Sequence, residues 1–386
     1  MPVGNAKTFL LICFSAFVAG NVSCQSRVHA QPGANISSLN FLGAYEITYS
    51  LRFKNTTVGG LSGIDYDADH QRYYIISDDK GAIEPARYYT ASIILTQKGI
   101  DSVYFTGVKN MLQPNGKPYP NNKQDPYHTP DPEAIRYNPL NKQLVWSSEG
   151  ERIINSKDTV LVNAAVTTIS MQGKYLNSFS LPHNLRVQAI EKGPRQNGVL
   201  EGITFADNYT TLFVNAEEPL YEDGARADNT PHKAYIRIFQ FDLARKRNTK
   251  QFGYQLEPVA YPPFPAGAFK INGVPDILSI AKNKLLVVER SFSTGRLACT
   301  VKLFIADLSA ATDIKNTPSL KNATGFVPAA KKLLLNMDDL GIYTGNIEGV
   351  SFGPALPNGH KTLLFVADNN FNPLERSQLL LFEVIE

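Results

Sequence analysis

The sequence predicts an all-β fold, a β-propeller of five four-stranded blades whose ring is closed by a strand near the N terminus. Three observations support this prediction. A short motif occurs five times at nearly constant intervals, each copy is followed by runs typical of strands, and the last copy lacks room for its fourth strand. Six blades are the alternative count.

The repeated motif begins with an apolar residue or proline and has Ser, Asp or Glu at its second position. Its five copies are Leu61–Ile64, Pro132–Ile135, Leu200–Ile203, Pro275–Leu278 and Ile347–Val350. The second positions, at 62, 133, 201, 276 and 348, are 71, 68, 75 and 72 residues apart. Such regularity argues against two β-sandwich domains, and solenoid repeats are shorter, about 20–45 residues.

Each motif is the expected first strand of a blade, and three further strands follow it. The expected second strands are the apolar runs Tyr73–Ile76, Leu144–Trp146, Leu212–Val214, Leu285–Val288 and Leu363–Val366. The expected third strands are Tyr89–Leu95, Val166–Met171, Tyr235–Leu243, Val301–Leu308 and Gln378–Val384. The expected fourth strands are Val103–Val108, Tyr175–Leu181, Gln251–Val259 and Lys332–Met337.

The fifth blade has no fourth strand of its own, because the chain stops at Glu386. A strand-like run, Tyr45–Phe53, precedes the first blade and has no other expected partner. We expect it to complete the fifth blade, which closes the ring and leaves no sheet edge open to aggregation.

The first thirty residues predict a signal peptide. Lys7 is followed by the apolar run 9–20, which is too short to span a bilayer comfortably. Val28–Ala30 offers small residues at both signal-peptidase positions, so cleavage is expected after Ala30. The alternative is lipid attachment at Cys24. Either route predicts export, to the periplasm or out of the cell.

The remaining sequence predicts a linker at 31–42 and one propeller domain at 43–386, with no later stretch that resembles a membrane helix. Without residues 1–30 the chain has 36 basic and 35 acidic residues, so its net charge gives no reason to expect a nucleic-acid partner. We expect a monomer. Cys299 is the cysteine left after processing, and a lone cysteine is more often a small buried apolar residue than a nucleophile.

Acidic residues gather where first strands begin and second strands end. Since neighbouring strands of a blade are antiparallel, these positions share one end of the ring. Crowded carboxylates must either take up protons or bind cations, and carboxylate oxygens suit Ca²⁺, or alternatively Mg²⁺. The expected metal ligands are Asp79, Glu133, Glu149, Glu201, Glu217, Asp276, Glu289, Glu348 and Asp368. The alternative is that such acids cap turns or pair with arginines to fasten blades together.

Several segments together resemble the phytase-like family described as having "esterase-like activity of phytase". They are Gly59–Gly63, Ser77–Asp79, Ala86–Tyr88, Asp131–Arg136, Ser148–Glu151, Gly193–Asn197, Leu200–Gly202, Glu217–Leu220, Glu289–Phe292, Asn346–Gly349 and Asp368–Phe371. The resemblance runs from about Gly59 to the C terminus. It implies a secreted or envelope-associated propeller hydrolase that acts on phosphate esters, phytate among them.

The mechanism expected from the residues and the resemblance is metal-dependent hydrolysis of a small anionic substrate. Arg87, Arg195 and Arg290 are expected to bind the phosphate oxygens, because a guanidinium matches phosphate geometry. Glu201, Glu348 and His128 are the expected catalytic residues, with His128 or a carboxylate moving the proton; an exposed loop histidine is the alternative for His128.

Two other functions fit the same sequence features. One is a lactonase or carboxylesterase that uses the same metal-bearing end of the ring. The other is a non-catalytic propeller that binds a ligand there. The sequence contains no nucleophile elbow, phosphate-binding Gly-rich loop or zinc-protease motif that would favour another hydrolase class.

Overall fold

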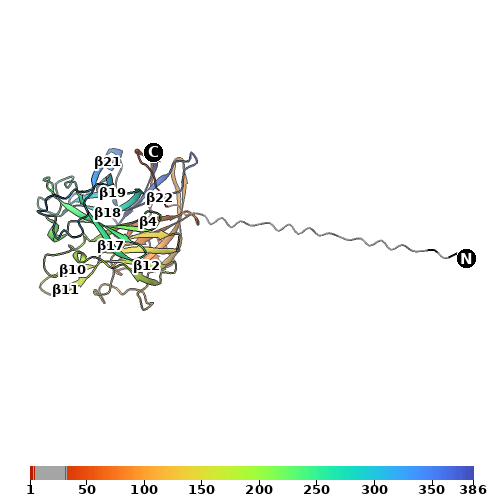
Figure 1. Ribbon diagram of the computed structural model, residues 1–386, viewed down its shortest axis with the longest axis horizontal. Coiled ribbons are helices and arrows are strands. Elements are labelled where there is room, and N and C mark those ends of the chain that lie inside the picture. The colour runs from red at the N-terminus through yellow and green to blue at the C-terminus, as the bar shows by residue number, and fades with distance from the viewer. Residues whose placement is uncertain (3, 5–30, 32) are drawn as a thin grey trace.

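The computed structural model describes residues 1, 2, 4, 31 and 33–386, and the rest of the predicted signal peptide, with its cleavage site after Ala30, lies outside these residues. Five antiparallel four-stranded sheets form a ring, which confirms the predicted five-bladed propeller (Figure 1). Within the described part of the chain, no helix is long and apolar enough to cross a membrane.

The blades follow one another along the chain, and the first four have their strands in sequence order from the centre of the ring outward. Blade one comprises β4 (Leu61–Asp67), β5 (Arg72–Ser77), β6 (Arg87–Thr96) and β7 (Gly99–Asn110). Blade two comprises β8 (Pro132–Asn138), β9 (Gln143–Ser148), β12 (Ala165–Ser170) and β13 (Tyr175–Ser178). Blade three comprises β14 (Leu200–Ala206), β15 (Thr211–Ala216), β16 (Tyr235–Asp242) and β17 (Arg247–Gln255).

The last two blades complete the ring. Blade four comprises β18 (Lys270–Ala281), β19 (Lys284–Ser293), β20 (Thr300–Asp307) and β21 (Ala330–Asn336). Blade five comprises β22 (Asn346–Gly353), β23 (Thr362–Asp368), β24 (Ser377–Ile385) and the N-terminal strand β1 (Ser38–Ile47). The innermost strands of the first and last blades, β4 and β22, lie side by side within the propeller, where Figure 1 labels them next to each other.

The closing strand is where the sequence predicted it, but its boundaries differ. β1 pairs antiparallel with β24 from Ser38 to Ile47, whereas the sequence indicated Tyr45–Phe53. The strand ends early because the chain turns after it: Leu51 donates a backbone hydrogen bond to the carbonyl of Thr48 at 3.1 Å, and Ser50 has a φ of 60°. The first residues of β1 therefore lie within the segment 31–42 that was expected to be a linker.

Two short hairpins stand outside the blades. β2 (Arg52–Phe53) and β3 (Thr56–Thr57) lead into blade one, and β10 (Glu151–Ile154) and β11 (Thr159–Val162) interrupt blade two between its second and third strands. The pair β10 and β11 lies at the lower left edge of the view in Figure 1. Three 3₁₀ helices of three or four residues complete the described secondary structure.

The hydrophobic core is divided into five main clusters, and each cluster lies between two neighbouring blades. The cluster between blades one and two, for example, contains Tyr74, Tyr88, Ile135 and Trp146, all buried. The other four clusters join blades two and three, three and four, four and five, and five and one. Since apolar contacts fix the blades against each other all round the ring, the polar residues near its axis are held on a rigid frame.

The five innermost strands all run in the same direction along the axis of the ring, so the ring has two distinct ends. We call the end where these strands begin the acidic end, and the end where they finish the aromatic end. Between the two ends, the guanidinium of Arg136 contacts both carboxylate oxygens of Asp276, at 2.7 and 2.9 Å. Both side chains are buried, and this ion pair separates the two ends of the ring.

Candidate functional site

A cavity of about 480 Å³ lies at the acidic end, and we call it the acidic cavity. Eight carboxylates line it, against three cationic side chains, Lys80, Arg290 and Arg296. The carboxylates are those of Asp78, Asp131, Glu133, Glu149, Glu201, Glu217, Glu348 and Glu375. The excess of carboxylates over cationic side chains disfavours a bare anion as the ligand, because like charges repel.

Irregular strand pairing places these acids. In blade three, Leu200 lies opposite Ala216 and Ile203 lies opposite Val214, so Glu201 falls in a bulge of the innermost strand. The same bulge holds Glu133 in blade two and Glu348 in blade five. A bulge turns side chains away from regular alternation, and here it directs each acid to the end of the ring.

In blade four, the register of the motif is shifted by one residue. Ile277 lies opposite Val287 there, as Ile64 lies opposite Ile75 in blade one. Asp276 therefore occupies the position of a glycine or alanine in the other motifs, one residue later than the sequence comparison placed it. By the same count Arg290 occupies the position held in other blades by an acid, so blade four contributes a cation to the acidic cavity.

The structure does not bring Asp276 into the acidic cavity. Its carboxylate is paired with Arg136 and also accepts a hydrogen bond from the backbone N–H of Val350 at 2.8 Å. Burial raises the pKa of Asp276 to about 6, although the charge of Arg136 opposes that shift. Asp276 fastens blade four to blade two, and it is not positioned as a metal ligand.

Asp79 and Glu289 also lie away from the cavity. Asp79 forms an ion pair with Arg87 at 2.8 Å and accepts backbone hydrogen bonds from Ala82 and Glu84, so it holds the loop after β5. Glu289 accepts hydrogen bonds from Tyr254 Oη at 2.7 Å and from Lys331 Nζ at 2.8 Å. Both acids match the structural alternative raised from the sequence.

Of the three arginines expected to bind phosphate, only Arg290 lines the cavity. Arg87 is fully buried and holds Asp79 and the carbonyl of Thr57. Arg195 donates to two backbone carbonyls and stacks over Tyr221, 4.3 Å from the ring centroid. These two guanidiniums make structural contacts and do not line the acidic cavity.

His128 is not part of the acidic cavity either. Its side chain is 69% exposed and pairs with Asp125 at 2.8 Å within the same loop. The structure therefore favours the exposed-loop alternative for this histidine. The cysteine prediction is consistent with the structure: Cys299 is buried at the cavity wall, and burial raises its pKa to about 11, which disfavours the nucleophilic thiolate.

Six of the expected ligands remain at the acidic end: Glu133, Glu149, Glu201, Glu217, Glu348 and Asp368. Oxygen atoms of Glu133, Glu149 and Glu201 lie within 4.8 Å of one another, and so do oxygens of Asp78, Asp131 and Glu133. Glu133 belongs to both groups. The two groups therefore form one continuous surface of carboxylate oxygens.

Asp78, Asp131 and Lys80 were missed. The sequence held a signal for Asp78, because the acids of blades two and three are sixteen residues after the motif acid, and sixteen residues after Ser62 is Asp78 rather than Asp79. Asp131 directly precedes the second motif. Lys80 contacts Asp131 at 2.5 Å and Glu151 at 3.6 Å, and no sequence pattern pointed to it.

Burial and mutual repulsion raise the pKa values of these acids. Burial, reinforced by neighbouring carboxylates, raises the pKa of Glu133 and of Glu201 well above the usual range. Asp78 and Asp368 are raised well above the usual pKa for the same reasons. Burial also raises the pKa of Glu149 to about 7, and a hydrogen bond joins Glu149 to Glu201. Adjacent carboxyl groups avoid repulsion when one of them keeps a proton.

Arg290 ties the cavity together. Its guanidinium contacts Glu217 and Glu348, both at 2.6 Å, and also Asn346. These ion pairs oppose the effect of burial on the two glutamates, although the pKa of each remains raised. Burial opposes the charge of Arg290, but the two glutamates outweigh it and raise the pKa of the arginine. Arg290 therefore stays charged and fixes two acids from different blades.

The acidic cavity fits a hard divalent cation. Several buried carboxylate oxygens of the described residues have no hydrogen-bond donor, and three of them belong to acids of the acidic end: Asp131 Oδ1, Glu348 Oε2 and Asp368 Oδ2. A buried polar atom without a partner is costly, and a bound cation would satisfy it. Carboxylate oxygens are the ligands that Ca²⁺ and Mg²⁺ prefer. The residues present therefore suit the expected metal.

A family model described as phytase-like, "Esterase-like activity of phytase", matches residues 56–371. The chain belongs to the phytase-like family. The match begins just before blade one and ends after the second strand of blade five, so it covers every residue of the acidic cavity except Asn372, Leu374 and Glu375. The comparison of this phytase-like protein with curated proteins gave no match.

Among solved structures, the phytase-like chain is similar to an endo-arabinase from Bacteroides thetaiotaomicron VPI-5482, with 11% identity, 88% of this chain and 98% of that chain covered, and a TM-score of 0.43. It is also similar to an alpha-L-arabinofuranosidase from Lactobacillus brevis, with 9% identity, 84% and 91% covered, and a TM-score of 0.44. Similarity at this level does not indicate what the phytase-like protein acts on.

Proposed function

We propose that this phytase-like protein is a metal-dependent hydrolase of ester bonds, with phosphate esters as its substrate class. The observation that carries the proposal is the group of buried carboxylates from several blades around one cavity, with unpaired oxygens among them. A stable fold does not need this arrangement, since burying unpaired carboxylates costs free energy. Perturbed titratable groups gathered in a cleft are characteristic of functional sites.

The cation would be held by the two groups that share Glu133, namely Asp78 and Asp131 on one side and Glu149 and Glu201 on the other. Ca²⁺ is the first candidate and Mg²⁺ the second. When bound, such an ion polarises a phosphoryl oxygen and lowers the pKa of a water molecule. The metal also explains how a cavity rich in carboxylates could accept an anionic substrate.

The chain's own residues would orient the substrate and move the proton. Oxygens of Glu149 and Glu201 lie within 4.8 Å of each other, and burial raises the pKa of Glu149 to about 7, the range in which a carboxyl group acts as acid or base at neutral pH. This pair takes the role that the sequence assigned to His128. Arg290 stands at the cavity wall with its Nε free of partners among the described residues, available to a substrate oxygen.

The second candidate is a lactonase or carboxylesterase, and the apolar residues that line the cavity favour it. Phe269, Leu297 and Leu374 are 55%, 76% and 74% exposed there, beside Phe292 and Tyr343. Because Arg87 and Arg195 are occupied elsewhere, only Arg290 of the expected arginines reaches the cavity. A neutral ester with an apolar group would suit this wall better than a highly charged phosphate.

The test is a hydrolysis assay on p-nitrophenyl phosphate, phytate, p-nitrophenyl acetate and a simple lactone, with added Ca²⁺ and with chelator. We expect turnover on phosphate esters that chelation abolishes, and we expect Glu201→Gln to lower it by about 100-fold or more. Glu46→Gln, an exposed glutamate on β1, is the matched control and should keep full activity. Chelator-resistant turnover would contradict the proposal, and turnover on acetate or lactone alone would favour the second candidate.

The expected export remains part of the proposal. Residues 1–30 would direct the protein to the periplasm or out of the cell, where Ca²⁺ is abundant enough to occupy a site of moderate affinity, as extracellular modules do. A fusion of residues 1–30 to a reporter enzyme would test this separately from the chemistry. Reporter activity confined to the cytoplasm would contradict it.

A further inference from the structure

We infer that the aromatic end of the ring is a second binding site, whose ligand is a neutral ring that carries several hydroxyl groups, such as a monosaccharide unit. A cavity of about 320 Å³ lies there, within the range of small-molecule sites, about 300–1,000 Å³. All five innermost strands contribute residues to it. It shares no lining residue with the acidic cavity, and the Arg136–Asp276 pair lies between the two.

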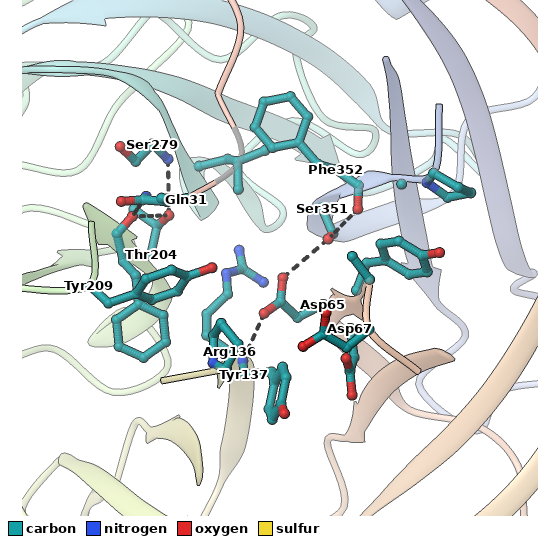
Figure 2. Close-up of a pocket in the computed structure, with 18 of the residues that line it drawn as sticks. Gln31, Asp65, Asp67, Arg136, Tyr137, Thr204, Tyr209, Ser279, Ser351 and Phe352 are labelled. Atoms are coloured by element: carbon teal, nitrogen blue, oxygen red, sulfur yellow. Dashed lines mark hydrogen bonds between the residues drawn. The ribbon is translucent and has the colours of Figure 1, made fainter. Parts of the chain in front are cut away.

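Asp65 lies at the centre of this cavity (Figure 2). One oxygen accepts the backbone N–H of Tyr137 at 2.7 Å. The other lies 3.2 Å from Ser351 Oγ, but that hydroxyl has a single proton and lies closer, at 2.8 Å, to the carbonyl of Phe352. A carboxylate has about four lone-pair sites, so Asp65 can accept at least one more hydrogen bond from a ligand.

Arg136 supplies the complementary donor. Its two terminal nitrogens are occupied by Asp276 and by backbone carbonyls, among them that of Ile64 at 2.6 Å. Its Nε, in contrast, is buried with no acceptor in the described part of the chain. A buried N–H without a partner is costly, which indicates an acceptor that occupies the cavity.

Donor and acceptor together select the ligand chemistry. A hydroxyl group can donate to Asp65 and accept from Arg136 at once. An ammonium group has no lone pair for Arg136 and would lie near its positive charge, whereas a phosphate would lie near the negative charge of Asp65. Thr204, Ser279 and Ser351 add further hydroxyl groups to the lining, which suits a ligand with several hydroxyl groups.

Aromatic rings form the walls of the cavity. Tyr66, Tyr137, Phe205, Tyr209 and Phe352 all line it, and Figure 2 shows the Tyr209 hydroxyl directed toward Arg136 and Asp65. The apolar face of a sugar ring packs well on such side chains, while its hydroxyl groups reach the polar floor. Few polar groups among aromatic walls are typical of sites that orient a small ligand.

The backbone around Tyr209 is strained, which supports a functional role. Asp207, Asn208 and Tyr209 have φ values of 51°, 52° and 61°, and a bulky residue is seldom found in this region. The side chain of Gln31 donates to the carbonyl of Phe205 and accepts the backbone N–H of Asn208. The N-terminal segment thus holds the turn that places the Tyr209 ring in the cavity.

The test is calorimetric titration of the whole protein with glucose, galactose and arabinose, and with benzylammonium and inorganic phosphate as charged probes, each up to about 50 mM. We expect at least one sugar to bind in the millimolar range or tighter. Asp65→Asn keeps the shape of the side chain and removes its charge, and it should weaken that sugar by about tenfold or more. Tyr209→Ala should do the same.

Glu201→Gln is the matched control, because it alters the acidic cavity and should leave sugar affinity within about twofold. Circular dichroism confirms that each variant folds, and Asp65→Asn decides the matter if Tyr209→Ala does not fold. Three results would overturn the inference: no sugar binds, a charged probe binds more tightly than every sugar, or Asp65→Asn retains full sugar affinity.

Discussion

The role of each charged side chain near the axis depends on whether an oppositely charged side chain lies close to it. Asp276 and Glu133 both occur in a repeated motif beside proline, and both are buried. Asp276 lies against Arg136, so its pKa rises only to about 6, whereas Glu133 faces other acids and its pKa rises well above the usual range. The first residue is structural and the second is available for a cation.

Loss of one partner of the Arg136–Asp276 pair should be strongly destabilising. Both side chains are buried and each satisfies the other. Removing one charge leaves the other unpaired in the interior, so we expect Asp276→Leu or Arg136→Met alone to lower the free energy of unfolding by about 3–5 kcal/mol. The double variant should recover much of this loss. Urea unfolding of the original protein, the two single variants and the double variant measures the coupling energy between the two side chains. Additive losses would contradict an ion pair that acts as a unit.

The acidic cavity should make stability fall as pH rises in the absence of metal. The pKa of Glu149 is about 7 in the folded protein and 4.5 in its ordinary state. Between these values the folded protein keeps a proton that the unfolded chain has lost, so the free energy of unfolding falls as pH increases from about 4.5 to about 7. Bound cation favours the ionised carboxylates and should restore stability.

Melting temperatures measured at pH 5 and pH 8, in chelator and in excess Ca²⁺, test this expectation. We expect a lower melting temperature at pH 8 than at pH 5 in chelator, and a clear rise on adding Ca²⁺ at pH 8. Glu149→Gln removes the titrating group and should reduce the pH dependence. A chelator-treated protein that becomes steadily more stable up to pH 8 would refute the assignment.

At the scale of strands, the sequence was a good guide wherever the repeat was regular. The interval of about seventy residues and the apolar runs predicted five blades and their strands, because alternation and turn residues are local signals. The register of blade four was not predictable, since the pairing of Ile277 with Val287 depends on the facing strand. The boundary of β1 was missed for a similar reason: its pairing partner β24 is about 340 residues away.

β1 should be essential for the integrity of the ring. It pairs with β24 over its full length, and without it the edge of β24 would be exposed. A chain that begins at Tyr49 should therefore aggregate or melt at a much lower temperature than one that begins at Gln31. Added peptide of residues 38–47 should restore the soluble form, because a strand can bind in trans to an open edge. Size-exclusion chromatography distinguishes these outcomes, and a stable monomer without β1 would contradict the role assigned to it.

For the whole molecule, the acidic cavity exists only because the ring closes. Its carboxylates come from residues as far apart as Asp78 and Glu348, and Arg290 of blade four joins Glu217 of blade three to Glu348 of blade five. The sequence could show that acids recur at strand ends. It could not show which acids are paired with an arginine, because Arg87 and Arg136 contact their acids only in the folded structure. Hence Asp79, Glu289 and Asp276 looked equivalent to the true cavity residues.

Close approach of the innermost strands sets the width of the ring. A Cβ on Gly202 would lie 2.6 Å from the Cα of Asp276, and a Cβ on Gly63 would lie 2.8 Å from the Cα of Ala134. Both contacts are to the backbone of the neighbouring blade, which cannot move alone. Glycine at these positions therefore brings adjacent blades together, and with them Glu201, which directly precedes Gly202.

Gly202→Ala should consequently disturb both stability and the acidic cavity. The added methyl group must push blade three away from blade four, and overpacking of this kind costs about 1–3 kcal/mol. Because Glu201 adjoins Gly202, we also expect Ca²⁺ affinity to fall by about tenfold.

Gly107→Ala is the matched control: the nearest atom to its Cβ is the hydroxyl oxygen of Thr90, at 2.7 Å, on an outer pair of strands where a side chain can rotate. Gly107→Ala should therefore change neither the free energy of unfolding nor the Ca²⁺ affinity much. Equal effects of the two substitutions on unfolding and on calorimetric Ca²⁺ binding would show that the width of the ring does not control the site.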